Sequence, residues 1–532
     1  MFEAAELGRK VSKQEFDEAE AELRTKLLAA QRELLGSKRS VVVVVSGVEG
    51  SRKSEVVNRL CEWLDPRGVQ THAFWDDSRE ERERPRFWRF WRRLPPRGAI
   101  GIMFGSWYTQ PIIDHAFDRL DAAAFEQEMR RCDQLERTLA VDGTIFVKFW
   151  FHLSKSAQVE RLSAIKAADG SSLKPGKEKK KGKGDKKRKG KAGKEKKKGK
   201  GDKKKGKGKG KKGWKLSPHL EEFSPLYDTF ARVSEAAIRL TDTGHGPWHI
   251  VEAADRNYRD LTAGRVLLAA IKQGLEQEPA PPAEVRPALI QPDATTILDS
   301  VDLTKSLELS DYKAQLSDAQ SRINRLAWGL RNQRRSCVAV FEGWDASGKG
   351  GAIRRCVAPI DARLYRVIPF AAPSDEEQAQ HYLWRFWRSV PEPGCLRIFD
   401  RSWYGRVLVE RVEGFAREDE WLRSFHEINA FESQLIEHGI GVAKFWIHIS
   451  KDEQLRRFEE RSQIPWKQHK ITDEDWRNRE KWDAYTEAID EMVKRTSTLA
   501  APWTLIAGND KRFARVQIVN TLADRIEATL AR

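Results

Sequence analysis

The chain has few cysteines and no long apolar run, and both absences narrow the possible classes of protein. It contains 5 cysteines in 532 residues, and their scattered positions match neither a metal site nor the disulfide framework of a small secreted domain. No apolar stretch approaches the roughly 20 residues that a membrane-spanning helix needs. The first residues lack the basic segment and apolar run of a secretory signal. We therefore expect a cytoplasmic protein without a membrane span.

The basic excess of the chain is confined to one segment. The net charge is +17, yet the segment from Lys174 to Lys212 alone contains 22 Lys, one Arg and four acidic residues, or +19, which leaves −2 for the rest. A Lys/Gly tract with almost no apolar side chain cannot bury enough surface to offset the entropy of ordering. We predict a disordered insertion over 167–213. It is either a solvated loop without a specific partner or a tether for a polyanion, such as a polyphosphate, a nucleic acid or an anionic surface.

Four short sequence motifs occur twice in the chain, at one fixed offset of 296 positions (343 − 47). Each motif of the first half reappears in the second with few changes: Gly47–Lys53 as Gly343–Lys349, Trp88–Arg92 as Trp384–Arg388, Ser106–Tyr108 as Ser402–Tyr404, and Lys148–His152 as Lys444–His448. Two copies of one domain therefore lie in tandem. The differences between them show which copy keeps the residues that chemistry requires.

Apolar runs alternate with charged helical stretches in both copies, which predicts an α/β fold with a parallel sheet covered by helices on both faces. The expected strands are 41–45, 98–104, 144–153, 338–341, 396–399, 442–449 and 504–506, with leading helices at about 12–36 and 311–334. The predicted organisation is a first domain over 1–275, a Pro-rich linker over 276–298 and a second domain over 299–532.

Gly343, Gly348 and Lys349 form a Gly-x4-Gly-Lys pattern between an expected strand and an expected helix. Glycines in such a loop let backbone N–H groups and the helix N-terminus surround phosphate oxygens, because a Cβ would block the close approach. The Lys ammonium then neutralises phosphate charge. The strand–loop–helix context favours this interpretation over a Gly-rich turn with a surface lysine, so we predict a phosphate-binding loop.

One position departs from the usual phosphate-binding loop, because Gly350 stands where a Ser or Thr hydroxyl ordinarily binds Mg²⁺. Asp345 in the loop and Asp400 at the end of an expected strand are the candidate ligands instead, since two carboxylates with substrate phosphates and water suit Mg²⁺. Arg401 can stabilise charge on a transferring phosphoryl group. The alternative is a surface Asp-Arg ion pair, which the position at a strand end makes less favoured.

The motifs of the second copy resemble those of the polyphosphate kinase 2 family. The resemblance spans nearly all of this copy, in a specific order: Gly343–Gly351, Asp400–Arg406, Leu408–Gly414, Lys444–Trp446, Thr496–Thr498 and Pro502–Trp503. The resemblance implies a P-loop kinase fold with a mobile helical lid and Mg²⁺ as cofactor. It also implies transfer of a terminal phosphoryl group from inorganic polyphosphate to a nucleotide. The tandem layout is similar to the class of this family that prefers AMP and forms ADP.

The family's functional residues carry over onto this sequence position by position. Asp345 and Asp400 match its two acids, Lys349 its phosphate-binding lysine, and Arg401 the neighbouring arginine. Other residues implied in phosphate binding are those of the loop, the following helix and the lid: Gly343, Ser347, Gly348, Gly350, Gly351, Arg354, Arg355, Arg461 and Lys467. For Arg354 and Arg355, an exposed helical surface is an equally good interpretation.

The first copy departs from the motifs at positions that the chemistry needs. Asp400 is replaced by Phe104, Arg401 by Gly105, Gly348 by Arg52 and Arg461 by Ile165, although Glu49 and Lys53 are retained. Loss of one such charge-stabilising group typically costs about 10²-fold or more in rate. The Lys/Gly tract also interrupts the lid region of this copy. We predict that the first copy is structural and catalytically inactive.

Other interpretations stay open. We interpret the repeated tryptophans as core or interface packing rather than base stacking, so no specific nucleic-acid partner is expected. These residues are Trp88, Trp91, Trp107, Trp384, Trp387 and Trp403. Alternatives to an AMP kinase are a polyphosphate-dependent NDP kinase, an ATP-dependent small-molecule kinase on the same fold, and a polyanion-binding scaffold acting through the Lys/Gly tract. Oligomerisation beyond the tandem pair is possible.

Overall fold

The protein is represented by a computed structural model that describes residues 1–168, 224–277, 296–465 and 473–532. Nearly all of the predicted insertion over 167–213, most of the predicted linker over 276–298, and Lys467 of the predicted lid lie outside these described residues. The domain boundaries predicted above therefore stay predictions.

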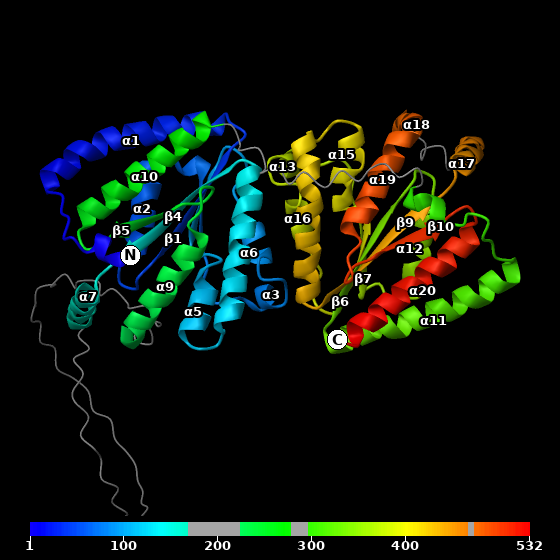
Figure 1. Ribbon diagram of the computed structural model, residues 1–532, viewed down its shortest axis with the longest axis horizontal. Helices are drawn as coiled ribbons and strands as arrows, with labels where there is room; N and C mark the ends of the chain where they lie inside the picture. Colours follow the sequence, from blue (N-terminus) through cyan, green and yellow to red (C-terminus); the bar gives the residue numbers. More distant parts are fainter. Residues whose placement is uncertain (169–223, 278–295, 466–472) are drawn as a thin grey trace, which may run out of the picture.

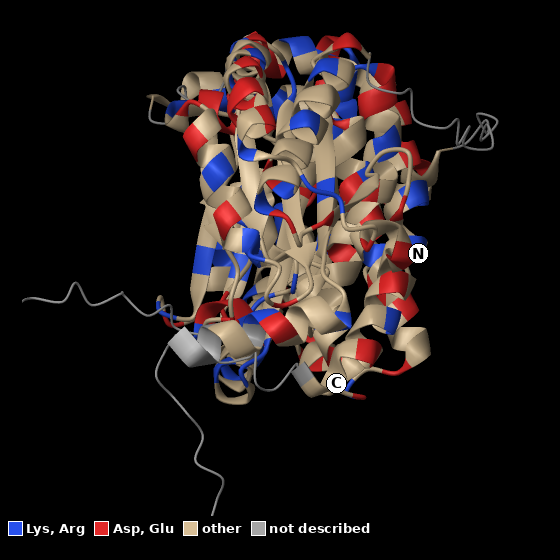
Figure 2. Ribbon diagram, turned by 90° about the vertical axis from the view of Figure 1, so that its left-hand side faces the viewer, with Lys and Arg blue, Asp and Glu red and all other residues tan. Residues whose placement is uncertain are grey.

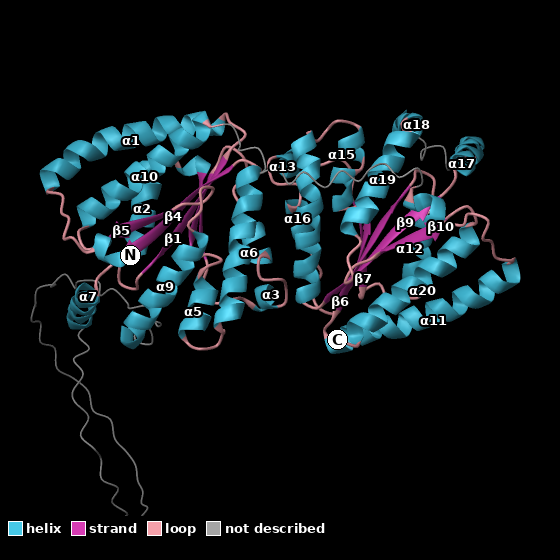
Figure 3. Ribbon diagram, viewed as in Figure 1, coloured by secondary structure: helices cyan, strands magenta, loops and turns pink. Residues whose placement is uncertain are grey.

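Each copy contains a five-stranded parallel sheet between helices, as the sequence predicted (Figure 3). The first sheet has the order β2-β3-β1-β4-β5, from β1 (Ser40–Gly47), β2 (Val69–Ala73), β3 (Ile100–Phe104), β4 (Thr144–His152) and β5 (Trp248–Glu252). The second sheet has the equivalent order β7-β8-β6-β9-β10, from β6 (Ser336–Gly343), β7 (Tyr365–Pro369), β8 (Leu396–Asp400), β9 (Ile440–His448) and β10 (Trp503–Ala507). The predicted α/β class and tandem arrangement are confirmed.

Alternating side chains of the central strand divide the first copy into two cores. Val41 and Val43 face a core with α1 and α10, whereas Val42 and Val44 face a core with α6 and α9 (Figure 1). This alternation follows from the two-residue period of a strand buried on both faces. The helices of this copy are α1 (Lys13–Leu35), α2 (Lys53–Trp63), α3 (Arg79–Arg82), α4 (Trp88–Trp91), α5 (Thr109–Ala116), α6 (Ala122–Val141), α7 (Lys155–Ala168), α9 (Tyr227–Thr241) and α10 (Arg256–Glu276).

The second copy repeats this packing around β6. Cys337 and Ala339 face α11 and α20, while Val338 and Val340 face α14, α16 and α19. Its helices are α11 (Leu309–Gln333), α12 (Lys349–Val357), α13 (Asp375–Gln378), α14 (Trp384–Trp387), α15 (Val409–Val412), α16 (Glu418–Glu437), α17 (Lys451–Gln463), α18 (Asp473–Glu480), α19 (Trp482–Thr496) and α20 (Lys511–Leu530). In Figure 1, α6 and α16 lie side by side at the centre of the molecule.

Charges of both signs are interspersed over the outer helices of the first copy (Figure 2). This agrees with the near-zero net charge that remains once the Lys/Gly tract is set aside. Among the described residues, no helix is both long and apolar enough to cross a membrane.

A buried lysine organises the inner core of each copy. Lys444 Nζ, with a side chain 0% exposed, donates hydrogen bonds to Glu432 Oε2 (2.8 Å), Tyr404 Oη (2.9 Å) and the carbonyl of Thr496 (2.7 Å). Glu432 also accepts bonds from Tyr404 and from Trp403. Burial lowers the pKa of the Lys444 ammonium and the Glu432 carboxylate opposes that shift.

The first copy repeats this network almost bond for bond. Lys148 Nζ donates to Glu136 (2.7 Å), to Tyr108 (3.2 Å) and to the carbonyl of Thr241 (2.7 Å). Trp107 donates to Glu136 as Trp403 does to Glu432. Two of the repeated sequence motifs, Ser-Trp-Tyr and Lys-Phe-Trp, supply the side chains of this network. They are therefore present in both copies because they form part of the core. The predicted role of these tryptophans in packing is confirmed.

We expect Lys444→Met to lower the free energy of unfolding of the second copy by about 3–5 kcal/mol, because Glu432 is left as a buried charge without its partner. The double variant Lys444→Met/Glu432→Gln removes both charges and keeps an acceptor for Tyr404 and Trp403, so it is expected to recover at least half of that loss. Urea unfolding followed by tryptophan fluorescence measures both values. A single variant within about 1 kcal/mol of the wild type would contradict the role given to this pair.

Candidate active site

The predicted phosphate-binding loop follows β6 and leads into α12. Gly343 has φ +151°, and a Cβ there would lie 2.6 Å from the carbonyl oxygen of Ile447, so only glycine fits. Gly348 precedes α12 with φ +108°. Gly350 and Gly351 lie in the first turn of that helix, where the N–H of Gly351 donates to the carbonyl of Gly348 (3.0 Å). Such a glycine-flanked loop at a helix N-terminus is a common setting for anion binding.

Lys349 curls back over the loop that it follows. Its Nζ donates to the carbonyl oxygens of Gly343 (2.6 Å) and Trp344 (3.2 Å), which fixes the ammonium above the loop. The Ser347 side chain is buried, and its Oγ has no hydrogen-bond partner among the described residues. A buried hydroxyl without a partner in a phosphate-binding loop is a polar group that a bound phosphate oxygen would satisfy.

The buried Arg457 of α17 binds backbone carbonyl groups of the loop. Its guanidinium is 2% exposed and donates to the carbonyl oxygens of Ala346 (3.0 Å) and Ser347 (2.8 Å). It also donates to the carbonyls of Gly508 and Asn509, and its Nε donates to Glu453 (2.6 Å). A planar guanidinium with five donors suits this set of carbonyl acceptors, and it ties the loop to two other segments.

Asp345 is a residue of the loop, and its side chain contacts the helix α18. Its Oδ2 accepts a hydrogen bond from Asn478 Nδ2 (2.8 Å), and Tyr485 Oη donates to Asn478 Oδ1 (3.1 Å). Its Oδ1 lies 3.6 Å from Arg401 Nη2. The structure thus brings two of the predicted residues, Asp345 and Arg401, together and adds an amide that orients the carboxylate.

Asp400 ends β8, in register with Phe341 of β6. Its carboxylate accepts no hydrogen bond from the residues that the structure describes. Beside it, Glu342 is buried, and Ser402 Oγ donates to it (2.8 Å). Burial raises the pKa of the Glu342 carboxyl, and the negative charge of Asp400 adds to the shift.

Arg401 compensates this group of carboxylates. Burial lowers the pKa of its guanidinium, but Asp345, Glu342, Glu474 and Asp400 together raise it above the usual value. Its backbone φ of +66° is uncommon for a residue with a side chain. The chain therefore turns sharply after β8, and Arg401 reaches Asp345 of the loop.

The remaining predicted residues lie around this centre. Arg354 is exposed on α12, whereas Arg355 is half-buried and donates to the carbonyl of Gly351 (3.3 Å). Arg461 is in the last turn of α17, the helix that leads to the predicted lid. Lys467 lies outside the described residues.

Sequence reasoning missed four residues of the site. Glu342 precedes the loop, but Arg457, Asn478 and Arg515 come from distant helices and carry no motif. Arg515 lies beside Gly351, where a Cβ would approach its Nη2 to 3.4 Å. A comparison of the two copies at the offset of 296 could have found Glu342, because the first copy has Ser46 there.

The first copy lacks three charged side chains that the second copy has around its loop. Glu342, Asp400 and Arg401 correspond to Ser46, Phe104 and Gly105. Lys53 nevertheless keeps the position of Lys349: its Nζ donates to the carbonyls of Gly47 (2.9 Å) and Val48 (3.1 Å) and to Glu49 (3.2 Å). The frame of the loop is thus present in the first copy, with Glu49 at the position of Asp345 but without a carboxylate at the position of Asp400.

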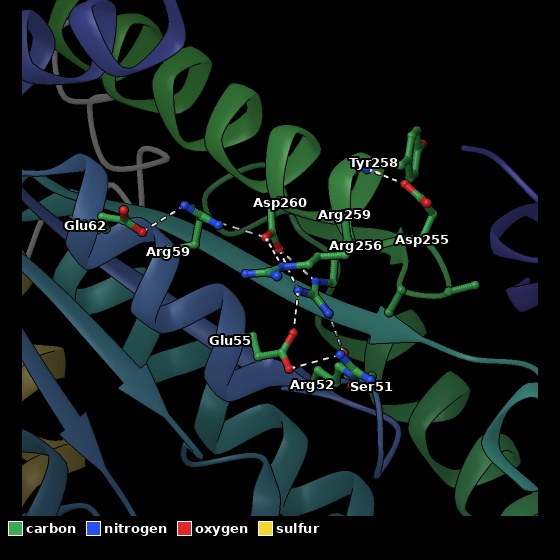
Figure 4. A network of polar contacts seen from close by, with 12 residues as sticks. Ser51, Arg52, Glu55, Arg59, Glu62, Asp255, Arg256, Tyr258, Arg259 and Asp260 are labelled. Carbon is green, nitrogen blue, oxygen red and sulfur yellow. Dashed lines mark hydrogen bonds and ion pairs between the residues drawn. The ribbon is translucent and has the colours of Figure 1, made fainter. Parts of the chain in front are cut away.

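An ion-pair network now borders the loop of the first copy (Figure 4). Arg52 contacts Glu55 (3.2 Å), Arg259 Nη2 contacts both Glu55 (3.3 Å) and Asp260 (2.8 Å), and Asp260 also faces Arg59 (3.7 Å). The arginines that border this loop are thus already paired with carboxylates of the protein.

The second copy has no carboxylate at the equivalent positions. Glu55 corresponds to Gly351, and beyond the insertion, where the offset is 255 (503 − 248), Asp260 corresponds to Arg515 and Arg256 to Lys511. Burial lowers the pKa of the Lys511 ammonium and the positive charge of Arg457 lowers it further, whereas Glu460, 3.9 Å away, and Glu453 oppose that shift. Arg515 and Lys511 thus place two positive charges where the first copy has one carboxylate and one arginine.

Comparison with known proteins places the chain in a family. A family model described as polyphosphate kinase 2 matches residues 10–191, 203–279 and 306–532. The chain belongs to the polyphosphate kinase 2 family. The resemblance seen in the sequence motifs is thereby confirmed, and the match spans both copies.

Several relatives of this polyphosphate kinase 2 chain share its two-copy length. A polyphosphate:AMP phosphotransferase of Pseudomonas aeruginosa is 44% identical over 531 residues, covering 99% of both chains. One of Acinetobacter johnsonii is 33% identical and covers 96% of both. A crystal structure titled as a polyphosphate kinase 2 of Pseudomonas aeruginosa superposes with a TM-score of 0.83 at 43% identity, covering 100% of both chains. The tandem arrangement is therefore shared with these relatives.

We expect Arg457→Met to loosen the loop, because four carbonyl oxygens and Glu453 lose one common donor. The predicted cost is about 3 kcal/mol in the free energy of unfolding of the second copy, with faster amide exchange over 344–348. Arg161→Met is the matched control, because Arg161 makes longer bonds, to the carbonyls of Gly50 (3.1 Å), Ala253 (3.5 Å) and Ala254 (3.2 Å), and its loss is expected to cost about 1 kcal/mol. Equal exchange in wild type and Arg457→Met would contradict this account.

Proposed function

We propose that this chain is a polyphosphate:AMP phosphotransferase, which transfers a terminal phosphoryl group from inorganic polyphosphate to AMP and forms ADP. The proposal rests chiefly on the full-length relatives of that name, which are 33–44% identical. It agrees with the retained loop and charged groups of the second copy. We assign the chemistry to that copy alone.

Binding of the donor is the first task of this site. Backbone N–H groups of the loop and of the first turn of α12 surround phosphate oxygens, and Lys349 supplies a fixed positive charge above them. Arg355, Arg515 and Lys511 extend this positive surface along α12 and α20, so that a chain of phosphates is held at several points. Arg354 and Arg461 would contribute from the exposed side.

The carboxylates fit a divalent cation. Asp345 and Asp400 present oxygen ligands, and the Asp400 oxygens accept no hydrogen bond from the described residues. Among the described residues, no group of three or more His, Cys, Asp or Glu side chains could hold a metal ion, so water and substrate phosphates would complete the shell. Mg²⁺ prefers that combination. When bound, Mg²⁺ would neutralise negative charge on the substrate phosphates.

Phosphoryl transfer of this kind depends on positioning and on charge stabilisation. Asn478 orients the Asp345 carboxylate, and Tyr485 in turn holds Asn478. Arg401 places its guanidinium beside Asp345, where it can stabilise charge on the transferring group. No covalent intermediate on the protein is required.

The reaction is tested by incubating the protein with a divalent metal ion, polyphosphate and AMP in the absence of ATP, and by separating the nucleotides. We expect ADP from the wild type and at least about 10²-fold less from Asp400→Asn, which removes a charge at the proposed metal site. Transfer to ADP or other diphosphates but not to AMP would replace the proposal by an NDP kinase. An absolute need for ATP would point to a different donor. No transfer at all would favour a polyanion-binding scaffold.

A further inference from the structure

The two copies contact each other through equivalent residues. Trp91 of α4 stacks on Trp387 of α14 with ring centroids 5.8 Å apart and an interplanar angle of 15°. The two are counterparts at the offset of 296, so each copy presents the same position to the other. That is the geometry of a two-fold contact between two like subunits, here within one chain (Figure 1).

The ion pairs around this stack do not share the symmetry. Arg423 of α16 donates to Asp142 beyond α6 (2.8 Å), with side chains 10% and 12% exposed. Arg97 of the first copy contacts the second oxygen of Asp142 (3.0 Å). Nearby, Arg131 of α6 pairs with Glu437 of α16 (2.8 Å). The Arg423–Asp142 and Arg131–Glu437 pairs each take one charge from each copy, whereas Arg97 and Asp142 both belong to the first copy.

The symmetry-related positions carry different residues. The counterpart of the Asp142–Arg423 pair is His438 with Gln127, and the counterpart of the Arg131–Glu437 pair is Glu427 with Val141. Glu427 is occupied within its own copy, where it lies 3.4 Å from His381 and 3.5 Å from Arg423. An interface that began as two like halves thus has complementary charges in one combination only.

We propose that the α16 face of the second copy binds the first copy specifically and rejects a second copy of itself. Pairing of two second copies would place Arg423 against His438 and Glu437 against Glu427. Arg423 would lose Asp142 and keep only the longer contact with Glu427 of its own copy, in a nearly buried position, and two carboxylates would face each other. The first copy is therefore the required partner of the catalytic copy, whatever the nucleotide acceptor is.

Self-pairing can be recreated inside the full chain by a two-residue graft. Val141→Glu/Asp142→His puts the second copy's Glu437-His438 into the first copy, where they face Glu427 and Arg423. We expect the graft to lower the apparent Tm of the first unfolding transition by about 6 °C or more in calorimetry. Glu126→His is the matched control, because that side chain of α6 is 55% exposed, and its Tm is expected within about 1 °C of wild type.

Charge reversal distinguishes specific pairing from simple disruption. Asp142→Arg is expected to lower the Tm as the graft does. Asp142→Arg/Arg423→Asp is expected to recover part of the loss, because the pair between the copies is restored with the charges exchanged, although the exchanged charges now face Arg97 and Glu427. If Asp142→Arg does not fold, recovery of a folded chain by the double variant gives the same support. A graft with unchanged Tm, or a reversal that recovers nothing, would overturn the proposal.

Discussion

A buried lysine–glutamate pair is the constraint on which both halves of this protein depend. Lys148 with Glu136 and Lys444 with Glu432 are almost fully buried, and each lysine also bonds a tyrosine and a carbonyl. A charge so placed tolerates no loss of its partner, because the remaining ion would be left uncompensated. The residues that satisfy it have therefore persisted in both copies, whether or not the copy retains chemistry.

The positions that serve catalysis follow the opposite rule. Ser46, Phe104 and Gly105 stand where the second copy has two acids and an arginine, so the first copy lacks charges of both signs at these positions. Arg52 and Glu55, which stand in the places of Gly348 and Gly351, form an ion pair beside the loop. Arg52 and Arg259 pair with carboxylates of the first copy, whereas Gly348 and Ala514 stand at those positions in the second copy. The two copies share the structural frame, but not the charged side chains around the loop.

The sequence predicted the sheets, the tandem order and the loop because these depend on local patterns. The sequence patterns did not predict the edge strands β2 and β7, because most of their side chains are at least partly exposed and no continuous apolar run marks them. In the site, Asp345, Lys349, Asp400 and Arg401 carry motifs, but Asn478 contacts Asp345 from 133 positions away. Such contacts arise from tertiary packing, and only the folded chain reveals them.

We propose that, of the two similar loops, that of the second copy performs the chemistry. Lys349 and Lys53 occupy the same position over their loops and bond the same pair of backbone carbonyls. The most direct test compares kcat for ADP formation in Lys349→Ala and Lys53→Ala. The account predicts a loss of about 10²-fold or more for Lys349→Ala and an unchanged kcat for Lys53→Ala. A comparable loss in folded Lys53→Ala would show that both copies take part in the reaction.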